Sequence, residues 1–141
     1  MIGIVDVGAY VPHYRVSRAA LGEAWRLEQA KALLIGERAV AGFDEDCITL
    51  AVEAVLHALA TRDGSLIDAL FFASTTAPFG EKSSAALIAA ACDLSASRTI
   101  DVSSSLRAST SALALAFDAL RAGSARQVVV AAADMRRGGG E

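Results

Sequence analysis

The sequence predicts an α/β fold in which a mixed, mostly parallel sheet is flanked by helices. Strand-like runs alternate along the chain with helical patterns, which is typical of consecutive βαβ units. The strands are continuous apolar runs, such as residues 128–133, as expected for parallel strands buried on both faces. With 54% hydrophobic residues and only two prolines, the 141-residue chain has the composition of one globular domain.

The first strand is expected over residues 2–7, and a helix over residues 16–27. Residues 27–42 are weakly helical and then loop-like, and no element is assigned to them. A second helix is expected over residues 45–60, with Asp44 as its N-cap. Its apolar stripe follows the helical period and consists of Ile48, Ala51, Val52, Val55 and Leu59.

A strand over residues 67–74 follows, and then a helix over residues 83–92. A strand over residues 99–103, a helix over residues 109–122 and a strand over residues 127–133 complete the pattern. The last helix ends at Gly123, and its expected apolar stripe is Leu113, Ala116, Phe117 and Leu120. Residues 138–141 look like a loop or linker.

Charge and cysteine content exclude several classes of function. The net charge of −3 argues against a nucleic acid or an anionic membrane as a partner. No apolar run approaches the ~20 residues that span a bilayer, and the start lacks the basic region of a secretory signal. Cys47 and Cys92 belong to no metal-binding motif, and His13 and His57 have no metal-binding partners nearby in sequence. Reduced thiols, no metal and a cytoplasmic location are therefore expected.

The segment from residue 99 to residue 122 has a strand, a tight polar turn and a helix. Such a turn can present a nucleophile at a helix N-terminus, where free N–H groups and the helix dipole favour an anion. The turn consists of Ser104, Ser105, Leu106 and Arg107, and none of them is a cysteine.

Several motifs resemble those of one enzyme family. The run LRASTSAL at residues 106–113, with Asp134 closing the next strand, resembles the nucleophile segment of the thiolase superfamily. It is closest to 3-hydroxy-3-methylglutaryl-CoA synthases of the archaeal type and to ketoacyl-ACP synthase III. The opening run IGIVDVGAYVP at residues 2–12 and the acidic loop AVAGFDED at residues 39–46 are similar to the same family. The order and spacing of these motifs carry the resemblance over nearly the whole chain.

The resemblance implies an architecture and a reaction class. Subunits of this family consist of two similar halves, each with a five-stranded mixed sheet. Residues 1–141 correspond to the N-terminal half, and the C-terminal half with its further catalytic residues is absent from this chain. The implied reaction is acyl transfer with carbon–carbon bond formation on coenzyme A thioesters, with no permanently bound cofactor.

Two positions that carry the family's chemistry differ here. Leu106 occupies the place of the nucleophilic cysteine, and Thr75, in the run ASTTAPF, occupies the place of the acid/base glutamate. Neither side chain can perform that chemistry. Ser104 or Ser105 could replace the nucleophile, but serines that complete a turn explain them more simply. Glu81 could replace the acid, but a solvated loop carboxylate explains it more simply.

The resemblance also suggests ligands and partners. Arg15, Arg18 and Lys31 could contact a coenzyme A phosphate, although scattered surface basic residues are the simpler explanation. A non-catalytic or partner subunit is the first hypothesis. The alternative is an active acyltransferase whose missing residues come from another chain or half; an unrelated flavodoxin-like module fits the motif order poorly. Uncovered apolar faces on the helices at residues 83–92 and 109–122 predict a homo-oligomer or a complex with a chain carrying the second half.

Overall fold

The computed structural model describes residues 1–26, 35–96 and 98–136. The chain forms two compact units. The larger unit comprises Met1–Tyr10 and Asp46–Met135, and the smaller unit comprises Val11–Glu45 and Arg136–Glu141.

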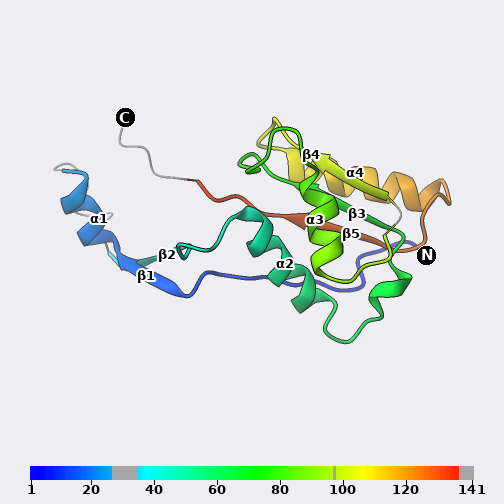
Figure 1. Cartoon of the computed structure of the whole chain (residues 1–141), viewed down its shortest axis with the longest axis horizontal. Helices are drawn as coiled ribbons and strands as arrows, with labels where there is room; N and C mark the ends of the chain where they lie inside the picture. The colour runs from blue at the N-terminus through cyan, green and yellow to red at the C-terminus, as the bar shows by residue number, and fades with distance from the viewer. Residues whose placement is uncertain (27–34, 97, 137–141) are drawn as a thin grey trace. The chain divides into compact units, whose positions relative to one another are not determined.

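A three-stranded parallel sheet is the centre of the larger unit (Figure 1). Strand β3 (Ala69–Ala73) lies between β4 (Arg98–Val102) and β5 (Val128–Ala132). The register places Phe71 opposite Ile100 on one side and opposite Val130 on the other. The predicted α/β fold is therefore confirmed, and these three strands lie where the apolar runs predicted them.

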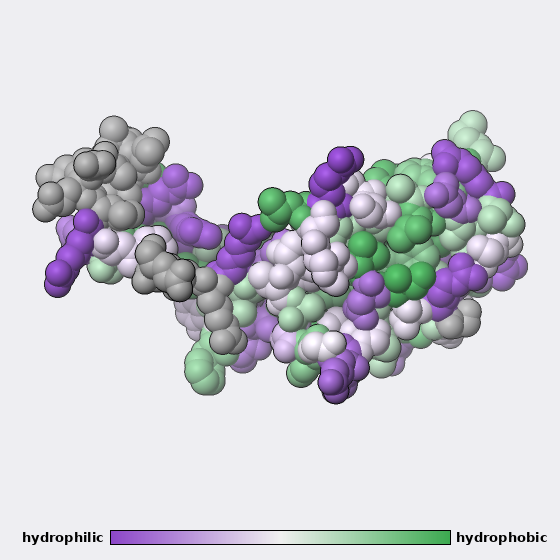
Figure 2. All heavy atoms as spheres, turned by 90° about the horizontal axis from the view of Figure 1, so that it is seen from above, coloured by the Kyte–Doolittle hydropathy of each residue, from purple (hydrophilic) through white to green (hydrophobic). Residues whose placement is uncertain are grey.

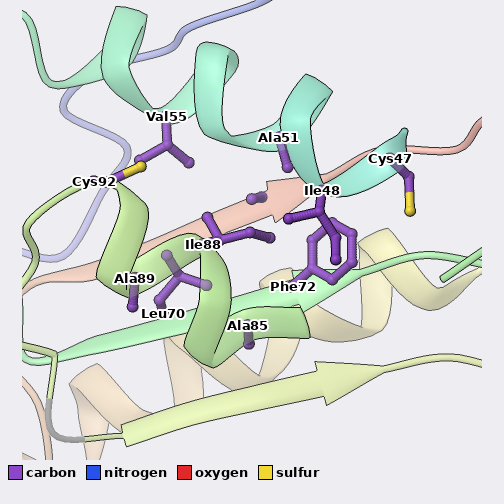
Figure 3. Close-up of a cluster of buried hydrophobic side chains, with 11 residues drawn as sticks. Cys47, Ile48, Ala51, Val55, Leu70, Phe72, Ala85, Ile88, Ala89 and Cys92 are labelled. Atoms are coloured by element: carbon purple, nitrogen blue, oxygen red, sulfur yellow. The ribbon is translucent and has the colours of Figure 1, made fainter. Parts of the chain in front are cut away.

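Helices cover both faces of this sheet. Helices α2 (Cys47–Ala58) and α3 (Ser84–Ala91) pack on the face that carries Leu70 and Phe72 (Figure 3). Helix α4 (Ala108–Arg121) packs on the opposite face, against Phe71 and its neighbours in β3. Because both faces are covered, all five residues of β3 are buried, which accounts for the uninterrupted apolar sequence.

Helix α2 begins with a capping box. The Asp46 carboxylate accepts hydrogen bonds from the N–H groups of Ile48 and Thr49, at 2.8 and 2.9 Å, and the Thr49 hydroxyl accepts one from the Asp46 N–H. This arrangement satisfies the free donors of the first turn. The expectation of Asp44 as the N-cap is therefore wrong by two residues. The predicted stripe of α2 is confirmed, with Ile48, Ala51 and Val55 buried.

The face that α4 turns to the sheet differs from the predicted one. Its buried residues are all alanines: Ala108, Ala112, Ala116 and Ala119. Of the predicted stripe only Ala116 is buried, while Leu113 lies at the surface. Small side chains bring the helix backbone close to β3, where a leucine stripe would need a wider gap.

Residues 2–7 form no strand and pair with no strand of the sheet, contrary to the predicted first strand. Side chains of the α2 region hold this segment instead. Arg62, shortly before the short helix η2 (Gly64–Leu66), donates to the Asp6 carboxylate and to the Val5 carbonyl oxygen, both at 3.1 Å. His57 lies 3.0 Å from the Ala9 carbonyl oxygen through its Nδ1 atom.

The smaller unit contains a two-stranded antiparallel sheet and one helix. Strand β1 (Tyr14–Ser17) pairs with β2 (Glu37–Val40), and α1 (Arg18–Ala24) follows β1 directly. The Ser17 hydroxyl accepts a hydrogen bond from the Ala20 N–H at 3.1 Å, so the helix begins two residues after the predicted start. Neither strand was predicted from the sequence.

Every helix in the described part of the chain is too short or too polar to cross a membrane.

Candidate functional site

A small cavity of about 150 Å³ lies at the carboxyl ends of two neighbouring strands, beside the start of α4. Carboxyl ends of parallel strands meet at one edge of a sheet, which is where α/β proteins commonly bind ligands. The lining residues come from three places in the sequence: Ala73, Ser74 and Thr75; Ser105, Leu106, Ala108 and Ser109; and Ala132, Ala133 and Asp134.

The structure brings three predicted site residues together. Leu106, Thr75 and Ser105 all line this cavity, although they are separated by up to 31 positions in the printed sequence. The Leu106 side chain is 80% exposed. Glu81, the other candidate acid, is exposed on the loop before α3 and does not line the cavity.

The turn before α4 is tight. Ser104 has a φ of 67°, in the left-handed region that few residues other than glycine adopt. The Ser105 carbonyl oxygen accepts a hydrogen bond from the Ala108 N–H at 2.9 Å, and its hydroxyl oxygen accepts one from the Arg107 N–H at 3.1 Å. Ser105 is thus engaged in closing the turn.

Asp134 fastens the end of β5 to the end of β3. One carboxylate oxygen accepts hydrogen bonds from the Thr75 N–H at 2.6 Å and from the Thr75 hydroxyl at 3.0 Å. The hydroxyls of Ser74 and Thr76 donate to the same oxygen at 3.2 and 3.3 Å. The Met135 N–H in turn donates to the Thr76 hydroxyl at 2.9 Å. We call Asp134 and residues 74–76 the carboxylate clasp.

The clasp was not predicted, although the sequence carried a signal for it. Asp134 directly follows one apolar strand, and the Ser-Thr-Thr run at residues 74–76 directly follows another. When such strands are parallel neighbours, these polar residues must meet at the same edge. Only the pairing of β3 with β5 was missing from the sequence argument.

Hydrogen bonding keeps Asp134 ionised. Partial burial raises the pKa of this carboxyl group. The hydrogen bonds from Thr75, Ser74 and Thr76 together lower the pKa by more, so it lies below its usual value. An ionised carboxylate at neutral pH has no proton to give, and Thr75 has committed its hydroxyl proton to it. This side of the cavity therefore lacks a general acid.

Both cysteines are free and buried. Cys47 is buried, and its thiol donates to the Thr76 carbonyl oxygen at 3.4 Å. Burial raises the pKa of the Cys47 thiol, and the charges of Asp46 and Asp134 act in the same direction. Burial likewise raises the pKa of Cys92. A raised pKa leaves little thiolate at neutral pH.

The basic residues proposed for a coenzyme A phosphate belong to the smaller unit or lie outside the described residues. Arg15 directs its guanidinium group to the carbonyl oxygens of Pro12, His13 and Tyr14 in its own segment. Arg18 is the first residue of α1, and Lys31 falls outside the described residues. Across residues 1–26, 35–96 and 98–136, no three acidic, histidine or cysteine side chains gather in a way that could hold a metal ion.

Comparison with known proteins identifies similar chains. No family model matches the sequence. The chain is 36% identical over 143 residues to a hydroxymethylglutaryl-CoA synthase from Pyrococcus horikoshii, and the match covers 97% of this chain and 39% of that relative. The chain therefore spans about two fifths of the length of this curated relative.

Solved structures show the same relationship. A β-ketoacyl-[acyl carrier protein] synthase III from Thermus thermophilus superposes with a TM-score of 0.83 at 32% identity, covering 94% of this chain and 43% of that one. MvaS in complex with 3-hydroxy-3-methylglutaryl coenzyme A superposes with a TM-score of 0.83 at 28% identity, covering 97% and 35%. The fold of the described residues is thus the fold of these condensing enzymes over part of their length.

Proposed function

Because the chain belongs to the thiolase superfamily as a relative of the hydroxymethylglutaryl-CoA synthases, we propose that it binds a coenzyme A thioester without forming an acyl-enzyme. It then acts as a non-catalytic partner, either in a homo-oligomer or with a chain that carries the second half of the fold. The relatives' activity on coenzyme A thioesters supports the ligand class.

The observation that carries this proposal is the side chain at the start of α4. Leu106 lines the cavity at the helix N-terminus, where an anionic nucleophile would be favoured, but its side chain is a hydrocarbon. On the opposite side of the cavity, Thr75 holds the place proposed for the acid/base residue and is bound to Asp134. A ligand can meet hydroxyls and apolar surface there, but no thiol that could accept its acyl group.

The phosphate end of the ligand is proposed to contact basic residues. Arg15, Arg18 and Lys31 are the proposed contacts, by resemblance to the family.

Mass analysis after incubation with acetyl-CoA or acetoacetyl-CoA tests the proposal. The native chain should show no covalent adduct, while saturation-transfer NMR should show that it binds the thioester. Leu106→Cys should gain a stoichiometric acetyl adduct, because a helix N-terminus lowers the pKa of a thiol. Leu113→Cys, within helix α4 and outside the small cavity, is the matched control and should stay largely unmodified.

Two outcomes would contradict the proposal. A stoichiometric acyl adduct on Ser104 or Ser105 of the native chain would restore the alternative, an active acyltransferase. Absence of thioester binding by the native chain, alone and together with a relative's second half, would remove the ligand.

A further inference from the structure

The carboxylate clasp fixes the direction of its hydroxyl protons at the wall of the small cavity. An ionised carboxylate has no proton, so it can only accept hydrogen bonds. The hydroxyls of Ser74, Thr75 and Thr76 lie 3.0–3.3 Å from one Asp134 oxygen and donate to it. Each hydroxyl has a single proton, so only its oxygen lone pairs remain for other groups.

Among these hydroxyls, that of Thr75 has lone pairs available to a ligand. The Ser74 oxygen accepts a hydrogen bond from the Thr76 N–H at 3.0 Å, and the Thr76 oxygen accepts one from the Met135 N–H at 2.9 Å. Within the described residues no group donates to the Thr75 oxygen, and Thr75 is exposed and lines the cavity. Thr75 therefore offers a ligand an acceptor but no donor.

The side of the cavity next to α4 has the opposite polarity. The Ser105 oxygen accepts a hydrogen bond from the Arg107 N–H at 3.1 Å, and its hydroxyl proton remains able to donate. Ser109 lines the same side of the cavity, and its hydroxyl can donate as well. A complementary ligand therefore directs an acceptor toward these serines and a donor toward Thr75.

The volume of the cavity limits the ligand to a short acyl group. A space of about 150 Å³ would hold roughly five water molecules at their liquid density. In a short acyl thioester, the carbonyl oxygen can accept from the serines while a substituent on the β-carbon extends toward Thr75. A β-hydroxyl can donate to the Thr75 oxygen. A β-keto oxygen would oppose one acceptor with another and leave both without a hydrogen bond.

We propose that Thr75, held by Asp134, determines ligand specificity by selecting β-hydroxyacyl thioesters and rejecting β-ketoacyl thioesters. The inference rests on the proposed function and names the ligand class of the same site. A glutamate, which the family resemblance assigns to this place, could donate or accept according to its protonation. A threonine whose proton is held by a carboxylate cannot exchange these roles.

Isothermal titration calorimetry of the native 141-residue chain tests the inference with thioesters of equal chain length. Butyryl-CoA has no β-oxygen, 3-hydroxybutyryl-CoA offers a donor, and acetoacetyl-CoA offers an acceptor. The tighter enantiomer of 3-hydroxybutyryl-CoA should bind roughly tenfold more tightly than butyryl-CoA, which is the effect of one net hydrogen bond. Acetoacetyl-CoA should bind no more tightly than butyryl-CoA.

Two variants separate the hydrogen bond from a structural effect, which would lower the affinity of every thioester alike. Thr75→Val keeps the size of the side chain and should remove the difference between 3-hydroxybutyryl-CoA and butyryl-CoA. Asp134→Asn supplies an amide that can donate to the Thr75 oxygen. The Thr75 proton then becomes available, and acetoacetyl-CoA should gain affinity relative to butyryl-CoA.

Thr61→Val is the matched control, because Thr61 is exposed and lies outside the cavity. This variant should leave all affinities unchanged, and circular dichroism checks that every variant folds. Equal affinities of the native chain for the hydroxy and keto thioesters would overturn the inference, as would an unchanged preference in Thr75→Val. Either result would leave the proposed function intact, whereas failure of all the thioesters to bind, butyryl-CoA included, would contradict both.

Discussion

Asp134 organises the end of the sheet through a single carboxylate oxygen. Four donors on residues 74–76 converge on it. These donors follow β3, whereas Asp134 follows β5. Hydrogen bonds to a charged acceptor are stronger than neutral ones. The clasp therefore holds one wall of the small cavity in a fixed shape.

Asp134→Asn should lower the free energy of unfolding by up to about 1 kcal/mol at neutral pH, because a neutral amide oxygen is a weaker acceptor and solvent screens the exposed carboxylate. The folded-state pKa of Asp134 is depressed below about 3.8. The difference in free energy of unfolding between the native chain and the variant should therefore be fully present above that pH. It should shrink as the pH falls through the folded-state pKa of Asp134. Chemical denaturation between pH 7 and pH 3 measures it.

Asp118→Asn is the control for this prediction. Asp118 forms an exposed ion pair with Arg121 on α4, and such pairs contribute little. An effect of equal size in both variants would contradict a special role for the clasp.

The candidate site could be predicted in part from individual residues. The strand, turn and helix pattern brought Leu106 and Ser105 to one place, and the structure places them in the same cavity as Thr75. The clasp could not be derived without knowing that β3 and β5 are neighbours. The chemical roles of Leu106 and Thr75 stay predictions until the acylation experiment is done.

At the scale of the elements, the packing of α4 depends on alanine. Ala112 and Ala116 are buried against β3, next to Ala69 and Ala73. Small residues on both sides leave no room for additional methyl groups. The neighbouring position Ala114 lies at the surface of the same helix.

Ala116→Leu should therefore destabilise the larger unit by about 1–3 kcal/mol, because the added carbon atoms must displace the helix or the sheet. Ala114→Leu introduces the same side chain on the exposed face and should change stability by less than about 0.5 kcal/mol. Thermal unfolding followed by circular dichroism compares the two. Equal midpoints would show that α4 does not pack closely on β3.

The N-terminal segment gives a second matched pair. A Cβ atom on Gly8 would lie 2.3 Å from the Ala54 carbonyl oxygen and 2.4 Å from the Ala58 nitrogen, both backbone atoms of α2. Gly8→Ala should detach the segment and speed hydrogen exchange at Val7 and Ala9, whose N–H groups donate to the Asp6 carboxylate and to His57 Nδ1. Gly3→Ala meets no atom within 4 Å and should leave exchange unchanged. Similar exchange in both variants would contradict the packing of this segment on α2.

The sequence predicted the parallel strands and the helices between them because continuous apolar runs mark β3 and β5 and helical patterns separate the strand-like runs. The prediction from the sequence was wrong where a strand depends on which other strand lies beside it. Residues 2–7 have a strand sequence but no neighbouring strand. Strands β1 and β2 pair only with each other. Their sequences contain charged residues such as Arg15 and Glu37, which have low strand propensity, so the strand pattern was not recognised.

For the whole molecule, the exposed apolar surface predicts association. Figure 2 shows hydrophobic side chains gathered on the visible face of the larger unit, and Leu106, Leu113 and Leu115 are exposed at or near α4. Helix α3 contributes less than the sequence suggested, because α2 and the sheet cover Ile88 completely. Of these two helices, α4 therefore leaves the larger apolar surface uncovered, and residues 1–7 of the same unit add the exposed Ile4, Val5 and Val7.

Light scattering at micromolar concentration should give a mass above the 14.5 kDa of one chain, because an apolar patch of this kind favours association. Leu115→Lys should shift the population toward one chain. Leu56→Lys, on the exposed side of α2, should not. A stable, well-dispersed particle of 14.5 kDa would contradict the prediction and favour a self-contained α/β module.

The division into two units also has an optical consequence. Trp25, which follows α1 in the smaller unit, is the one tryptophan in the sequence. Fluorescence excited at the indole band therefore reports the smaller unit, while the far-ultraviolet signal comes mainly from α2, α3 and α4. Coincident melting curves would mean that the two units unfold as one cooperative system, and separated curves would resolve two transitions in a single sample.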